Sequence, residues 1–322
     1  MRKYIHKLQP TTYVLLKVLF IMLMTVFSAC SQRELCYDHP HSVSVNIEFD
    51  WSEATDATPS TMVVYFFPVD NSQYTRFELT NEGYDTGNGF NSTIKVATGT
   101  YRVVCHNGDT NNNLEKGEIF SEYQITTTDE DLLAPLKRSD EAPRPETTEN
   151  QPVHAQASTL YSYTHPETIK LKPNQDHTIV MKPRKSSAVI TVTIDSVENI
   201  VTGMEFSGII SGLAESWYPS TGMPGGVEVT VPLRLTHEGT DCLRGRMEVL
   251  GDNIAHNIGH KFRLYTSWNY YFDFDITDQI HSAPDPYNID ITLSGVALPE
   301  AGSGMNVSVG EWEPAEIINI SM

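Results

Sequence analysis

The chain has 322 residues, with 22 Lys+Arg against 41 Asp+Glu and a formal net charge of −19 at pH 7. This acidic balance disfavours nucleic acid and anionic lipid headgroups as partners, because both carry negative charge themselves. Apolar residues make up 39% of the chain, which is ordinary for a globular protein and excludes a chain that is disordered throughout.

The N-terminal residues have the pattern of a secretory signal. Basic residues precede the apolar run Val18–Cys30, and small residues stand before its cysteine. The run is shorter than the ~20 residues that a helix needs to cross a bilayer. Its end, Phe27-Ser28-Ala29-Cys30, resembles a bacterial lipobox, in which the cysteine receives acyl chains such as palmitate and becomes the mature N-terminus. Phe27 stands where Leu is usual, and an ordinary cleaved signal is the alternative.

Removal of a lipoprotein signal peptide, residues 1–29, leaves 18 bases against 41 acids, a net charge of −23. The remaining length suggests two domains, each large enough to bury its own core. We place the boundary after Pro183, because a polar, basic segment there precedes a fresh alternating strand. The predicted domains are residues 30–183 and 184–322. Acyl chains on Cys30 would tether them to outer-membrane lipid, and we expect the two domains to be exposed at the cell surface.

Three cysteines follow Cys30: Cys36, Cys105 and Cys242. Export permits disulfides, but three is an odd number and the spacing is irregular. Cys36–Cys105 is the one pair that we consider. The alternative is that all three act as small apolar residues.

Short strands of alternating apolar and polar residues dominate the chain. In the first domain we expect strands at Val43–Trp51, Thr61–Val69, Thr75–Leu79, Thr93–Ala97, Gly99–Cys105, Thr168–Leu171 and Thr178–Met181, the last two as a hairpin. In the second we expect Ala188–Ile194, Glu205–Leu213, Glu228–Leu235, Cys242–Leu250, Lys261–Trp268, Tyr270–Ile276, Tyr287–Leu293, Val307–Val309 and Ile317–Ile320. The pattern predicts an all-β fold of two tandem β-sandwiches.

One long segment interrupts this rhythm. Asp129–Ala157 is rich in acidic residues and prolines and has no periodicity. It predicts a long exposed loop or a mobile flap, either a tolerated insertion or a carrier of function.

No motif of catalytic chemistry is recognisable, so we do not expect an enzyme or a cofactor. The histidines of Asp38-His39-Pro40-His41 could share a zinc ion, but further ligands cannot be identified, and a polar strand entry is favoured. Asp109–Gly117 imitates a calcium loop, yet Leu114 and Phe120 stand where the template needs Gly and Glu, so a surface turn is favoured. No metal site is therefore predicted.

Exposed aromatic residues could stack on sugars. Trp217 and Tyr218, in a Pro/Gly-rich context, are candidate ligand-facing aromatics, as is the Trp268–Tyr271 stretch. Packing in the core or between sheets is the favoured alternative for both.

Several features together resemble the fimbrillin-related lipoproteins of type V pili, of the FimB/Mfa-like anchor and accessory type. Besides the lipobox, they are Leu35–His41 leading into Val43–Trp51, Ala97–Val104, Ile209–Glu215, Tyr218–Gly222 and Val307–Trp312. The resemblance implies two transthyretin-like β-sandwiches and assembly with other fimbrial subunits by strand exchange. An unpaired sheet edge is a ready template for such a strand.

If the C-terminus is the donated strand, Ile318 and Ile320 share one face and are its candidate anchors. The alternative is that Ile317–Met322 completes its own domain. For the whole chain, the resemblance favours a lipid-anchored structural protein in cell adhesion. A surface lipoprotein that binds glycan or a host ligand alone is the alternative, and an exported enzyme is the least favoured.

Overall fold

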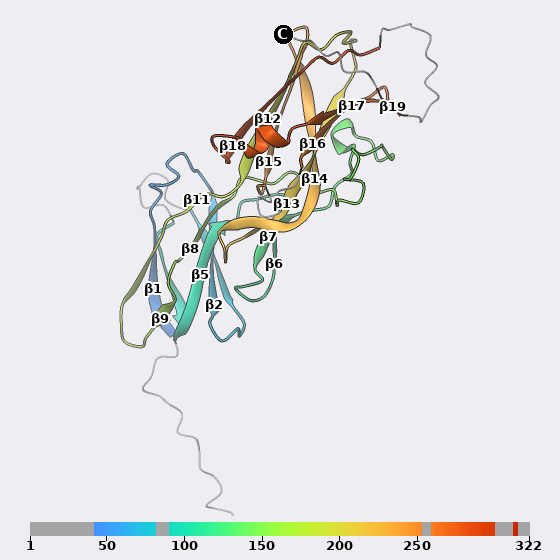
Figure 1. Cartoon of the computed structure of the whole chain (residues 1–322). Coiled ribbons are helices and arrows are strands. Elements are labelled where there is room, and N and C mark those ends of the chain that lie inside the picture. The colour runs from blue at the N-terminus through green and yellow to red at the C-terminus, as the bar shows by residue number, and fades with distance from the viewer. Residues whose placement is uncertain (1–41, 82–89, 253–258, 300–311, 315–322) are drawn as a thin grey trace, which may run out of the picture. The chain divides into compact units, whose positions relative to one another are not determined.

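The computed structural model describes residues 42–81, 90–252, 259–299 and 312–314 (Figure 1). Within these ranges the chain is almost entirely β-strand, apart from the 3-10 helix η1 (Ala134–Leu136) and helix α2 (Thr277–His281). The all-β prediction is confirmed. Neither helix of this part of the chain is long and apolar enough to cross a membrane.

Two sheets enclose the first core. One has the order β10-β1-β4 and the other the order β11-β8-β5-β2-β3, with β9 beside β5. The strands are β1 (Ser42–Phe49), β2 (Thr61–Pro68), β3 (Thr75–Thr80), β4 (Ser92–Ala97), β5 (Gly99–Asn107), β8 (Tyr161–Thr164), β9 (Ile169–Leu171), β10 (His177–Met181) and β11 (Arg184–Lys185). Alternation places Val43, Val45 and Ile47 of β1 in the core, opposite Met62, Val64 and Phe66 of β2.

The expected hairpin between Thr168–Leu171 and Thr178–Met181 is wrong. β9 pairs with β5, whereas β10 pairs in parallel with β1 in the other sheet. Both strands were recognisable from their alternation, but alternation carries no information about the partner strand.

β2 is buried on both of its faces. Val63, Tyr65 and Phe67 point away from the first core and pack with Tyr123 in a separate cluster. Tyr123 lies just before β7 (Gln124–Thr127), which pairs with β6 (Asn113–Lys116). The β6–β7 hairpin therefore brings aromatic cover to the outer face of the first sandwich.

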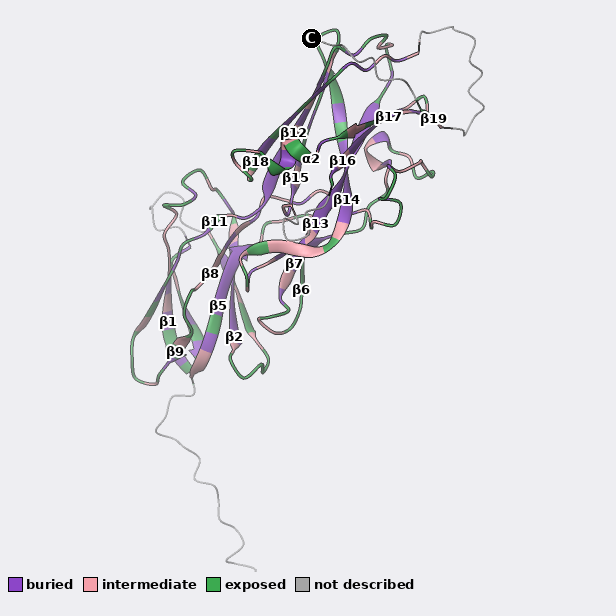
Figure 2. Cartoon of the chain, in the orientation of Figure 1, coloured by how far each residue is buried: buried purple, intermediate pink, exposed green. Residues whose placement is uncertain are grey.

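A ten-stranded sheet builds the second core. Its main order is β18-β12-β15-β14-β13-β16-β17-β19, and β7 joins it by pairing with β13. The strands are β12 (Ala188–Asp195), β13 (Phe206–Tyr218), β14 (Met223–Glu238), β15 (Cys242–Val249), β16 (Lys261–Thr266), β17 (Tyr270–Asp275), β18 (Asn288–Ser294) and β19 (Glu313–Pro314). Side chains from β12 and β18 share one apolar cluster with those from β13, β14, β16 and β17. Figure 2 shows the buried stretches along these strands and the exposed loops between them.

The segment Asp129–Ala157 is a long loop without strands, as predicted, but it is anchored on the second sheet and is not a free flap. Leu133 and Leu136, around η1, are 0% and 5% exposed and pack with Ile209 and Tyr265 of the second sheet. The backbone N–H of His154 also donates to the carbonyl of Thr230 at 3.0 Å. A few apolar anchors among polar residues are enough to fix an aperiodic segment on a sheet.

The domain boundary between residues 183 and 184 stays a prediction. The two apolar cores are separate clusters, which agrees with two sandwiches. β7, from the first half of the chain, nevertheless pairs with β13, with Thr126 opposite Ser216 and Ile125 opposite Trp217.

Candidate functional site

Three of the predicted site residues lie outside the described residues: Cys30, Ile318 and Ile320. The same holds for Cys36 and for Asp38–His41. Lipidation, the donated strand and the Cys36–Cys105 disulfide therefore stay predictions. Cys105 itself is fully buried in the first core, where burial raises the pKa of its thiol.

Trp217 and Tyr218 lie at the end of β13. Trp217 is only 3% exposed and packs with Ile125, Leu160 and Leu250. Within the described part of the chain its Nε1 has no hydrogen-bond partner. The Tyr218 ring is half-buried and lies against Gly225, where an added Cβ would come within 3.3 Å of it. Trp217 thus presents ring surface to the interior rather than to open solvent.

A largely apolar cavity of about 450 Å³ opens beside Trp217. Its lining includes Leu250, Ile280, Tyr287 and Ile289. The side chains of Ser186, Asp252 and His281 contribute polar groups to its wall. Apolar walls with a few polar groups are typical of small-molecule sites.

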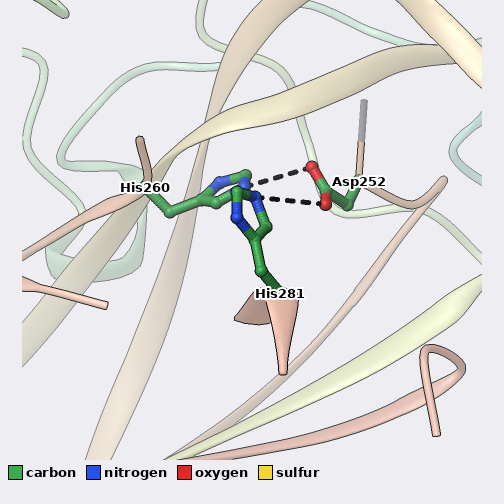
Figure 3. A group of neighbouring side chains, drawn as sticks. All are labelled: Asp252, His260 and His281. Atoms are coloured by element: carbon green, nitrogen blue, oxygen red, sulfur yellow. Dashed lines mark ion pairs between the residues drawn. The ribbon is translucent and has the colours of Figure 1, made fainter. Parts of the chain in front are cut away.

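Asp252, His260 and His281 come together at this cavity (Figure 3). Asp252 follows β15, His260 directly precedes β16, and His281 ends α2. One ligand-type atom from each residue lies within 4.8 Å of the other two. The backbone N–H of His260 donates to Thr277 Oγ1 at 2.9 Å, which ties the start of β16 to α2.

The His260 ring is completely buried and held in one orientation. Its Nδ1 lies 3.0 Å from the carbonyl oxygen of Ser211. A carbonyl only accepts hydrogen bonds, so Nδ1 carries a proton and Nε2 faces the other way. There Nε2 lies 3.1 Å from Asp252 Oδ1. It makes no hydrogen bond within the described residues, however, because direction as well as distance decides a bond.

The Asp252 carboxylate lies close to the imidazole rings of both His260 and His281. Its Oδ2 lies 3.6 Å from His281 Nε2, and its side chain is 13% exposed against 28% for that of His281. The two imidazoles meet edge to face, with ring centroids 5.1 Å apart and an angle of 84° between their planes. Both Nε2 atoms therefore converge on one carboxylate.

A β-bulge positions the Ser211 carbonyl. The register between β13 and β14 shifts between Ile210 and Leu213, and Gly212 has a φ of +81°. The N–H of Ala214 then donates to the carbonyl of Gly251 at 3.1 Å, which holds the start of the Asp252 loop. Gly251 has a φ of +126°, so a side chain there would strain the backbone. Bulges often re-aim groups beside functional sites.

A second buried histidine, His106, also faces a carboxylate. Its Nδ1 lies 2.9 Å from the carbonyl of Asn107, and its Nε2 lies 2.8 Å from the Tyr123 hydroxyl and 3.2 Å from Glu115 Oε1. The Tyr65 hydroxyl donates to the same carboxylate, and Arg76 Nε lies 3.6 Å from it. These residues cover the outer face of β2.

The pKa values of this second cluster follow from its contacts. Burial alone would raise the pKa of Glu115, but hydrogen bonds from His106 and Tyr65, together with the charges of His106 and Arg76, lower it to about 2. Burial and the Glu115 carboxylate raise the pKa of the Tyr65 and Tyr123 hydroxyls. Both tyrosines therefore keep their protons and remain donors.

The Asp252–His260–His281 cluster was missed by the sequence analysis. Its members are 8 and 21 residues apart and match no ligand-spacing motif. The available signal was weak: Asp252 directly follows Gly251 and His260 directly follows Gly259, so two metal-ligand residue types each stand after a glycine.

The fold is shared with proteins of known structure. It is similar to a candidate adhesin from Bacteroides ovatus ATCC 8483, with a TM-score of 0.61 and 17% identity over 84% of this chain and 97% of that one. A candidate polysaccharide-binding protein (DUF1812) from Bacteroides thetaiotaomicron VPI-5482 gives a TM-score of 0.52 and 10% identity over 80% and 92%. The fimbrial anchor protein Mfa2 from Porphyromonas gingivalis gives 0.49 and 15% over 78% and 90%. The TM-scores of the first two structures show a shared fold.

The family is defined by sequence. Residues 29–234 match the model of DUF5119, a domain of unknown function, and the chain belongs to that family. No curated protein matches the chain significantly.

Proposed function

We propose that this chain is a fimbrial or adhesin-like protein of the cell surface, held in the outer membrane by acyl chains on Cys30. Its role would be that of a fimbrial anchor or accessory subunit. The observation that supports this best is the fold shared with the candidate adhesin over 84% of this chain and 97% of that one. The lipobox-like end of Val18–Cys30 agrees with a tethered, extracytoplasmic body.

Strand exchange is the proposed mode of assembly. Among the described residues, the two-residue strand β19 is the last strand beyond β17 in this sheet. It pairs in parallel with β17, with Glu313 opposite Tyr270 and Pro314 opposite Tyr271. Such an edge offers backbone groups to a further strand. A donated strand binds through its backbone, and alternate side chains such as Ile318 and Ile320 give specificity.

The tether is tested by replacing Cys30. Cys30→Ser should remove acylation and move the protein from the detergent phase into the soluble fraction. Cys36→Ser is the matched control, since it removes a nearby cysteine that lies outside the lipobox-like pattern. A Cys30→Ser protein that stays in the detergent phase like the control would refute the lipid anchor.

The exchange mechanism is tested at the C-terminus. Deletion of Ile317–Met322, or Ile318→Asp alone, should leave a folded monomer that no longer joins a neighbouring subunit. Asn319→Asp is the control, because an extended segment points residue 319 to the opposite face. Unfolding of the isolated deletion variant would show instead that the segment completes its own domain.

A second candidate function is binding of a glycan or host ligand by the chain alone. Trp217 and Tyr287 in the wall of the 450 Å³ cavity favour it, since aromatic rings stack on apolar faces of ligands. One fold neighbour is itself described as a candidate polysaccharide-binding protein. Retention of the purified chain on immobilised polysaccharide, reduced by Trp217→Phe, would support this function, and absence of retention would count against it.

A further inference from the structure

We propose that Asp252, His260 and His281 bind a divalent transition-metal ion of the zinc type, with a coordination position left open toward the apolar cavity. This site goes beyond the fimbrial function and does not depend on it. Two imidazole nitrogens and one carboxylate oxygen are the ligand set, and all three side chains converge on one point (Figure 3).

The orientation of His260 is the first argument. Because Nδ1 donates to the Ser211 carbonyl, the lone pair of a neutral ring sits on Nε2 and faces the Asp252 carboxylate. A lone pair and a carboxylate repel each other at 3.1 Å. A cation between them turns this repulsion into two bonds. Metal-bound histidines usually donate their other ring nitrogen to a carbonyl or carboxylate, as His260 does.

The unsatisfied nitrogen is the second argument. His260 Nε2 is fully buried and has no hydrogen-bond partner within the described residues. Leaving a buried polar atom without a partner destabilises the folded state, so such atoms call for an explanation. Protonation of the ring does not supply one, because the Asp252 oxygen lies outside hydrogen-bonding geometry and a second imidazole, His281, faces the same carboxylate.

The spacing is the third argument. Metal bonds of about 2.0–2.2 Å in a tetrahedral site place ligand atoms roughly 3.3–3.6 Å apart. The two nitrogen–oxygen distances are 3.1 and 3.6 Å. The three elements are also held in place: β13 fixes His260 through Ser211, and Thr277 of α2 binds the His260 backbone.

The ligand set decides the class of metal. Imidazole nitrogens suit zinc, copper, nickel and iron, whereas calcium and magnesium prefer cages of oxygen atoms. Zn²⁺ accepts three protein ligands and leaves a fourth position for water or another molecule. Asp252 and His281 line the cavity, so that fourth position would face it. A donor group on a molecule in the cavity could therefore complete the coordination.

Titration of Zn²⁺ into the metal-free full chain tests the proposal. We expect one tight site per chain and a rise in melting temperature on adding Zn²⁺, because binding stabilises the folded state. His281→Gln and Asp252→Asn should each weaken Zn²⁺ binding at least ~10-fold and remove that rise. His237→Ala, which removes an exposed histidine of β14, is the control and should leave both unchanged.

Folding of each variant is checked by its circular dichroism spectrum and melting curve without metal. Two different ligand variants are used because either one alone could perturb α2 or the Asp252 loop. Equal Zn²⁺ affinity in the wild type and in both folded ligand variants would overturn the proposal. Equal binding of Ca²⁺ and Zn²⁺ at the site would overturn the assignment to a transition metal.

Discussion

Two of the three buried histidines among the described residues, His106 and His260, differ in how they meet a neighbouring carboxylate. His106 meets Glu115 in a cluster that already contains a tyrosine hydroxyl at 2.8 Å and a nearby arginine. His260 meets Asp252 with no hydrogen bond at Nε2 within the described residues, and its second neighbour is another histidine. In both rings Nδ1 forms a hydrogen bond with a backbone carbonyl oxygen. The two histidines therefore differ in the partners of Nε2.

This difference separates a structural cluster from a binding site. Around His106 the protein supplies every donor, and the pKa of Glu115 is accordingly lowered to about 2. Around His260 two imidazole nitrogens and a carboxylate converge, and His260 Nε2 has no hydrogen bond within the described residues. A cation would give these three groups a common partner.

Of the variants proposed here, truncation of Tyr123 in the His106 cluster should change the free energy of unfolding most. The Tyr123 side chain is 2% exposed and packs on Tyr65 and Phe67. Tyr123→Ala should lower the free energy of unfolding by about 3–5 kcal/mol, the usual cost of truncating a buried aromatic. Tyr123→Phe, which removes only the hydroxyl, should cost ~1 kcal/mol. Denaturant melts of both variants provide the measurement, and equal losses would show that the hydroxyl dominates.

A smaller effect is expected at Glu115. Its folded pKa of about 2 lies below the ordinary value of 4.5. Its contribution to stability is therefore complete above about pH 4.5 and is lost as the pH falls toward 2. Because the side chain is 31% exposed, solvent screens the charge, and Glu115→Gln should cost about 1–2 kcal/mol at neutral pH.

The free energy of unfolding of the wild type and of the variants, measured between pH 7 and 2, checks the contribution of Glu115. Glu115→Gln should flatten the acid limb of the curve, whereas Glu118→Gln, at an exposed position of the same region, should not. An unchanged acid limb in Glu115→Gln would place the acid sensitivity elsewhere in the chain.

The smallest change in the free energy of unfolding is expected for Asp252→Asn in metal-free protein. It distinguishes the Asp252 cluster from the His106 cluster. Asp252→Asn keeps the shape and offers an amide N–H to the lone pair of His260. We expect the free energy of unfolding to change by less than about 0.5 kcal/mol, or to rise slightly. Thermal melts in the presence of a chelator measure this. A loss as large as that of Glu115→Gln would mean that Asp252 is already paired without a metal.

Most strands of both sandwiches could be predicted from sequence because alternation reports directly on burial, as in Val43, Val45 and Ile47. The short strands β6, β7 and β8 were not predicted. The parallel pairs β1–β10 and β12–β18 could not, since alternation does not name the partner strand. Leu133 and Leu136 anchor Asp129–Ala157 on the second sheet. Two isolated apolar residues form no periodic pattern, so the sequence did not indicate this packing. The Asp252 cluster required the bulge in β13, which depends on tertiary pairing.

Anomalous diffraction at the zinc absorption edge, from crystals of the protein grown with Zn²⁺, tests the contrast between the two histidines most directly. The account predicts a single strong peak within ~2.2 Å of Nε2 of His260, Nε2 of His281 and one oxygen of Asp252, with no peak at His106. A hydrogen bond from His260 Nε2 to Asp252, with no peak between them, would contradict it.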